Sequence, residues 1–146
     1  MDKINSRIKR SIAMKKSMLL HCSGAIKRAS DEMHHTIKKG KKILWCGNGG
    51  SAADAQHMAA ELMGGLISHN RPPIPSIALT TDTSLLTAWT NDMSYATVFS
   101  RQILGIGNKG DLLVAISTSG NSENVIKAVI TAKEKGIRSV SLTGNG

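Results

Sequence analysis

The sequence is poor in aromatic residues and cysteines. Aromatics make up 3% of the 146 residues, so we expect a core built from Ala, Ile, Leu, Val and Met. The two cysteines, Cys22 and Cys46, are too few for a disulfide framework, and they lack the spacing and the neighbours of a structural zinc site. No apolar run approaches the roughly 18 residues that a membrane-spanning helix needs. These absences exclude a disulfide scaffold and a membrane-spanning protein, and they favour the reducing cytoplasm.

The formal net charge is +9, and the excess lies near the N-terminus. Residues 1–42 hold 12 of the 19 Lys and Arg and 3 of the 10 Asp and Glu, whereas residues 43–146 hold 7 of each. A nucleic-acid-binding domain would combine such a basic patch with a readout element or interleaved aromatics. Residues 1–42 contain no aromatic residue. We therefore interpret the charge as a solvated helix face and predict no nucleic-acid partner, with a nucleic-acid binder as the alternative.

Apolar residues near the N-terminus recur every three or four positions. They are Ile4, Ile8, Ile12, Leu19, Cys22, Ile26, Ala29, Met33 and Ile37. This spacing predicts an amphipathic helix of about 35 residues, with Gly24 as the point where it would break. Its apolar stripe needs a partner, either the rest of the domain or another subunit. We assign residues 1–40 to an N-terminal helix for oligomerisation and residues 41–146 to a second domain.

Short apolar segments alternate with helical patterns after residue 40. We predict strands at 41–46, 76–79, 111–116 and 137–142, and helices at 52–63, 83–90, 93–106 and 123–135. This alternation predicts an α/β fold, a doubly wound parallel sheet flanked by helices. The sequence ends directly after its fourth predicted strand. Because doubly wound domains do not usually end there, we expect a final strand and helix to be missing from it.

Two predicted strand–turn–helix units have the same chemical form. Residues 47–51 are glycine-rich, and residues 117–122 carry four hydroxyls around a glycine. Each turn puts backbone N–H groups at a helix N-terminus, where they favour an anion. Either turn alone could be an ordinary turn with an N-cap serine, but two in one small domain favour a phosphorylated ligand. Neither turn matches a P-loop or a dinucleotide fingerprint, which argues against a nucleotide cofactor.

Two further pairs of residues carry chemistry. His57 and Glu61 are four residues apart, so they share one helix face and could be two ligands of a metal such as zinc. Glu61 could also move a proton. The alternative is a hydrogen bond on the helix surface. Asn91 and Asp92 fall between two predicted helices, where they could cap the second helix or bind a sugar hydroxyl.

These segments together resemble the sugar isomerase (SIS) domain family. The resemblance rests on CGNGGSAADAQHMAAEL at 46–62, TND at 90–92 and GDLLVAISTSGNSENVIKA at 110–128. Within the family, they look like the enzymes that convert sedoheptulose 7-phosphate to D-glycero-D-manno-heptose 7-phosphate in lipopolysaccharide heptose biosynthesis. The resemblance implies an SIS-type sheet, proton transfer through an enediolate, and a cytoplasmic homotetramer with sites at subunit interfaces.

The resemblance also implies roles for individual residues. The substrate site would be lined by Asn48, Gly49, Gly50 and Ser51. The sugar would be contacted by Asn91 and Asp92, and the phosphate would be held by Ser117, Thr118, Ser119 and Ser122. His57 and Glu61 would be zinc ligands, and Glu61 would also act as the base. The family takes its remaining zinc ligands, a Gln and a His, from a last helix, and we expect those ligands beyond residue 146.

A non-catalytic relative is the second hypothesis. An SIS domain can bind a sugar phosphate as a sensor or serve as a protein-interaction module. Such a module does not need a carboxylate one turn from a histidine. The presence of Glu61 therefore favours the enzyme.

Overall fold

The computed structural model describes residues 1–144 and divides into two compact units, Met1–His34 and His35–Gly146. The first unit holds helix α1 (Asp2–His21) and most of α2 (Ser23–Lys38). The predicted long helix is thus interrupted at Cys22, two residues before Gly24. There the Ser23 hydroxyl donates to the Leu19 carbonyl at 2.6 Å. Within this unit, no residue of α1 is buried, and nothing covers the stripe that contains Ile4 and Ile8.

The second unit is built on a parallel sheet of four strands in the order β2-β1-β3-β4. The strands are β1 (Ile43–Gly47), β2 (Ser76–Ala78), β3 (Leu112–Ser117) and β4 (Arg138–Thr143). Strand β2 pairs with one edge of β1, and the chain then crosses over so that β3 pairs with the other edge. This reversal makes the carboxyl ends of β1 and β3 a topological switch point, where open α/β sheets bind their ligands.

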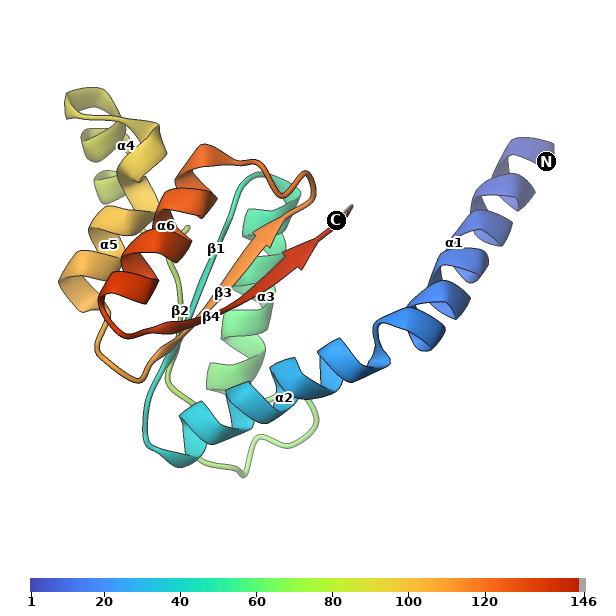
Figure 1. Ribbon diagram of the computed structural model, residues 1–146, viewed down its shortest axis with the longest axis horizontal. Coiled ribbons are helices and arrows are strands. Elements are labelled where there is room, and N and C mark those ends of the chain that lie inside the picture. The colour runs from blue at the N-terminus through green and yellow to red at the C-terminus, as the bar shows by residue number, and fades with distance from the viewer. Residues whose placement is uncertain (145–146) are drawn as a thin grey trace. The chain divides into compact units, whose positions relative to one another are not determined.

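Helices cover both faces of this sheet (Figure 1). Helix α3 (Gly50–Gly64) contacts β1, β2 and β3, while α6 (Glu123–Glu134) contacts β3 and β4 and packs on α5 (Val98–Ile106). Helix α4 (Thr83–Asp92) and the 3₁₀ turn η1 (Tyr95–Thr97) lead into α5. The predicted doubly wound α/β fold is therefore confirmed. Among residues 1–144, no helix is long and apolar enough to cross a membrane.

The core follows the alternation of side chains along the strands. Leu44 and Cys46 of β1 join Leu113 and Ala115 of β3 in the main apolar cluster, together with residues of α5 and α6. The expectation that methionine contributes to the core is wrong for residues 1–144, where no methionine is buried. The space is instead filled by aliphatic residues and by two of the few aromatics, of which Phe99 belongs to that cluster. The aromatics fit there because a rigid ring fills more volume per side chain.

A buried ion pair ties the beginning of β1 to the beginning of β3. Lys42 Nζ lies 2.6 Å from Asp111 Oδ2, and the side chain of Asp111 is 2% exposed. The same carboxylate accepts the backbone N–H groups of Lys42 and Asn108, so it is fully hydrogen-bonded. A buried charge with these partners is satisfied, and it anchors the sheet at the end opposite to the switch point.

Candidate functional site

The two turns singled out in the sequence lie next to each other at the switch point. Gly47, the last residue of β1, pairs in register with Ile116 of β3. The glycine-rich turn leaves β1 directly into α3, and the serine-rich turn leaves β3 into α6. Two helix N-termini therefore begin at neighbouring strand ends. Their free N–H groups and dipoles make this edge suited to an anionic ligand.

Glycines allow this close approach. A Cβ on Gly47 would lie 2.8 Å from both the Cβ and the carbonyl oxygen of Ser51, and 2.9 Å from the carbonyl oxygen of Ile116. Only a residue without a side chain fits between β3 and the first turn of α3. Gly49 has a φ of 54°, the left-handed region that favours glycine, and occupies the N-cap position of α3 without a side-chain cap.

The serine-rich turn presents its hydroxyls in two groups. Ser117 is buried, and its Oγ lies 3.1 Å from Ser122 Oγ. Thr118 and Ser119 are exposed, and Ser119 Oγ accepts the backbone N–H of Asn121. Ser122 occupies the N-cap position of α6, but its side chain makes no capping hydrogen bond. The alternative of an ordinary capping serine is therefore not what the structure shows. The Val125 N–H donates to the Ser122 carbonyl, and no side chain caps the N–H groups that precede it in α6.

Asn48 is held by two residues that the sequence analysis missed. Its Nδ2 donates to Asn124 Oδ1 at 2.9 Å, and its Oδ1 accepts from Asn124 Nδ2 and from the Tyr95 hydroxyl, both at 2.8 Å. Asn124 is 3% exposed. Asn124 lies within the motif at 110–128, which could have marked it as a site residue. Its hydrogen-bond partner Asn48, however, lies 76 residues away in the sequence.

His57 and Glu61 share one face of α3, as predicted. His57 Nε2 lies 3.9 Å from Glu61 Oε1, a distance that suits an ion pair and is too long for a hydrogen bond. The alternative of a hydrogen-bonded surface pair is therefore not observed. A His nitrogen and a carboxylate oxygen are donors that zinc accepts. Within residues 1–144, however, no third His, Cys, Asp or Glu joins them, so these residues fit zinc in kind but do not complete a site.

Asn91 and Asp92 do not lie between two helices. Both belong to the last turn of α4, both are exposed, and Asn91 Nδ2 donates to Asp92 Oδ1 at 2.8 Å. The cap of the next element is Ser94, which accepts the backbone N–H of Ala96. The alternative role of this pair as a cap is therefore wrong, because the helix extends through both residues. Their proposed contact with a sugar stays a prediction.

Cys46 lies just before the glycine-rich turn but takes no part in the site. Its side chain belongs to the buried apolar cluster. Burial raises the pKa of the Cys46 thiol to about 12, because the thiolate would be desolvated there. A thiol with this pKa stays protonated and is a poor nucleophile.

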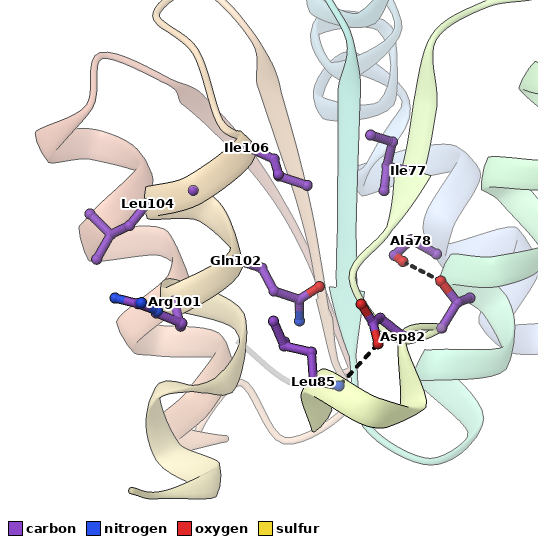
Figure 2. A pocket seen from close by; sticks show the side chains of 10 residues that line it. Ile77, Ala78, Asp82, Leu85, Arg101, Gln102, Leu104 and Ile106 are labelled. Atoms are coloured by element: carbon purple, nitrogen blue, oxygen red, sulfur yellow. Dashed lines mark hydrogen bonds between the residues drawn. The ribbon is translucent and has the colours of Figure 1, made fainter. Parts of the chain in front are cut away.

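A separate cavity of about 470 Å³ lies beside the edge strand β2, between the start of α4 and α5 (Figure 2). Its polar groups are already engaged: Asp82 Oδ1 accepts the backbone N–H of Leu85, and Gln102 Nε2 donates to the Leu79 carbonyl. Arg101 stacks over the Trp89 ring at 4.6 Å. This cavity contains none of the residues predicted from the sequence, so the switch point is the stronger candidate site.

Comparisons with known proteins identify the family. The SIS domain family matches residues 8–144. A phosphoheptose isomerase from Akkermansia muciniphila is 53% identical over 128 residues, which make up 88% of this chain and 67% of that protein. A phosphoheptose isomerase from Nitratidesulfovibrio vulgaris is 56% identical over 111 residues, or 76% of this chain and 53% of that protein.

Solved structures show the same relationship. The structure of phosphoheptose isomerase from Neisseria gonorrhoeae matches with a TM-score of 0.90 and 43% identity, over 97% of this chain and 73% of that one. The enzyme from Francisella tularensis matches with a TM-score of 0.94 and 37% identity, over 99% of this chain and 77% of that one. The chain is homologous to phosphoheptose isomerases, and it spans about half to two thirds of the length of the curated relatives.

The close approach at Gly47 predicts a stability effect. Gly47→Ala is expected to lower the free energy of unfolding by about 1–3 kcal/mol, because the new methyl group overlaps backbone atoms that cannot move aside. Urea denaturation measures the change. The matched control is Gly105→Ala in α5, where nothing lies within 4 Å, and it is expected to be neutral or slightly stabilising. Equal stability of the two variants would contradict the steric argument.

Proposed function

Because the chain belongs to the SIS domain family, we propose that it binds sedoheptulose 7-phosphate and converts it to D-glycero-D-manno-heptose 7-phosphate, a step of heptose biosynthesis. The observation that carries this proposal is the meeting of two uncapped helix N-termini at the switch point. A phosphomonoester is the ligand that such an edge favours.

The phosphate is proposed to lie at the serine-rich turn. Ser117, Thr118, Ser119 and Ser122 are the hydroxyl donors proposed to surround it. The N–H groups at the start of α6 add further donors, since no side chain caps them. Several donors and a favourable helix dipole together hold an anion without a basic side chain.

The sugar is proposed to extend from this turn along the glycine-rich turn. Asn48, Gly49, Gly50 and Ser51 would line it, with Asn91 and Asp92 contacting its hydroxyls. The glycines leave backbone N–H groups open to a polyol, and Asn48 adds a side-chain amide. Binding of the phosphate would orient the reacting end of the sugar, which is how remote contacts accelerate a reaction.

Glu61 is the proposed base. Its side chain is 26% exposed, so it is partly desolvated but still reachable. In the reaction, the carboxylate takes a proton from C1 of the ketose and an enediolate forms across C1 and C2. The proton is delivered to C2, and a hydroxyl proton moves from O1 to O2, which gives the aldose. Hydrogen-bond donors near O2 stabilise the developing charge.

The first test replaces the base. Glu61→Gln is expected to lower isomerisation at least about 100-fold, while the Kd for sedoheptulose 7-phosphate changes little, because the amide keeps the shape and loses the basicity. Product formation is followed by NMR and binding by calorimetry. Asp54→Asn, an exposed carboxylate on the same helix, is the control and leaves both unchanged.

Three outcomes would contradict part of this proposal. Turnover retained by Glu61→Gln would overturn the base assignment. A wild-type chain that binds the sugar phosphate without converting it would support the non-catalytic SIS module. A wild-type chain that does not bind it would overturn the proposed function.

His57 and Glu61 are also proposed as two zinc ligands. Within residues 1–144, no third His, Cys, Asp or Glu joins these two donors. Removal of metal by a chelator is therefore expected to leave the Kd for sedoheptulose 7-phosphate unchanged, as measured by calorimetry with and without EDTA. Binding that is lost with EDTA and restored by zinc would show that the metal holds the substrate.

A homotetramer with sites at subunit interfaces is the proposed assembly. Helix α1 leaves its apolar stripe uncovered, and Glu61 lies 11 residues beyond the start of α3, or about 16 Å along the helix. This distance of the base from the N-terminus of α3 favours a site completed by a second copy. Light scattering of the purified chain is expected to give four times its 15.5 kDa mass, and a monomer would contradict it.

A further inference from the structure

The contacts of Asn48 assign a role to two residues outside the predicted site. We infer that Asn124 and Tyr95 are positioning residues, which hold the Asn48 amide in the orientation that binds the sugar of a sugar phosphate. This inference rests on the proposed function, because it concerns the same site.

Asn48 and Asn124 form a reciprocal pair of amides. Each Nδ2 donates to the Oδ1 of the other, at 2.9 and 2.8 Å. Asn124 is the second residue of α6, and it is 3% exposed. The pair therefore links the glycine-rich turn after β1 to the helix that follows the serine-rich turn after β3. It joins the two proposed halves of the binding site, for sugar and for phosphate, directly across the switch point.

Tyr95 brings a third element to the same atom. Its hydroxyl donates to Asn48 Oδ1 at 2.8 Å, so this oxygen accepts hydrogen bonds from both η1 and α6. The 3₁₀ turn η1 is itself held in place, since Ser94 caps it and Trp89 Nε1 donates to Thr97 Oγ1 at 2.9 Å. The Tyr95 hydroxyl is therefore presented by a fixed element.

These contacts decide what Asn48 can offer to a substrate. Its carbonyl oxygen already accepts two hydrogen bonds, and one of its two Nδ2 protons is donated to Asn124. One N–H remains, and the partners on both ends of the amide hold its direction. A donor whose orientation is set before binding does not lose rotational freedom when it meets a sugar hydroxyl. Asn124 and Tyr95 thus act through Asn48.

The decisive variant is Tyr95→Phe, which removes one hydroxyl and keeps the ring. Tyr95 is 48% exposed, so the fold is expected to survive the change. Calorimetry gives the Kd of the full chain for two probes, sedoheptulose 7-phosphate and inorganic phosphate. We expect sugar-phosphate binding to weaken about three- to tenfold, the worth of one hydrogen bond, with inorganic phosphate unchanged. A general loosening of the site would weaken binding of both probes.

A double-mutant cycle separates positioning from direct contact. In the Asn48→Ala background, Tyr95→Phe is expected to have no further effect on sugar-phosphate binding, because the amide that accepts the Tyr95 hydroxyl is gone. Ser139→Ala is the control: it removes an exposed hydroxyl from β4, outside η1 and the two turns, and leaves the Kd unchanged. Asn124→Ala is expected to weaken sugar-phosphate binding at least as much as Tyr95→Phe, and if it does not fold, the Tyr95 cycle decides.

Failure of this inference differs from failure of the proposed function. Wild-type binding with an unchanged Kd for Tyr95→Phe would overturn the inference and leave the function standing. The inference would also be overturned, with the function left standing, if Tyr95→Phe weakened binding equally in the wild-type and the Asn48→Ala backgrounds. A wild-type chain that binds neither probe would overturn both.

Discussion

The parallel pairing of β1 with β3 is the constraint on which the rest of this structure depends. Every residue of both strands is buried, so the pair forms the centre of the sheet and the lining of the core. Their pairing also reverses the direction of strand addition, which brings the turn after β1 beside the turn after β3. At the other end, an ion pair joins Lys42 and Asp111, the residues that directly precede the two strands.

The close approach of these strand ends imposes its own requirements. Gly47 leaves no room for a side chain between the first turn of α3 and the carbonyl of Ile116. The two helix N-termini that result lack side-chain caps. The first backbone N–H groups of an uncapped helix need water or an anion as a hydrogen-bond acceptor. The reciprocal amides of Asn48 and Asn124 then keep the two turns in a single relative position. The missing side-chain caps and the paired amides therefore occur at the same two turns.

Much of this fold was accessible from the sequence, because the signals were local. Apolar segments separated by glycine-rich turns predicted the order of the strands and helices, and the motifs identified both turns and the His57–Glu61 pair. Two helix bounds were wrong: the helix predicted at 93–106 begins at Val98, after η1, and the predicted long N-terminal helix is interrupted at Cys22. Two expectations and one alternative were wrong for reasons that are not local. Asp92 belongs to α4, and the core contains Trp45 and Phe99 while no methionine of residues 1–144 is buried. The alternative of a capping serine is wrong because Ser122 Oγ lies 3.1 Å from Ser117 Oγ and makes no capping hydrogen bond to α6.

The sequence by itself determined the order of the elements, the chemical character of the two turns and the family, because each depends on residues close together in the chain. Only the tertiary structure decided which side chains meet. Asn48 and Asn124 are 76 positions apart, and Tyr95 reaches the same amide from a third element. Such partners depend on strand order, register and the entry of each helix, and no pattern within one segment encodes them. The selection of hydrogen-bond partners is therefore a property of the assembled sheet.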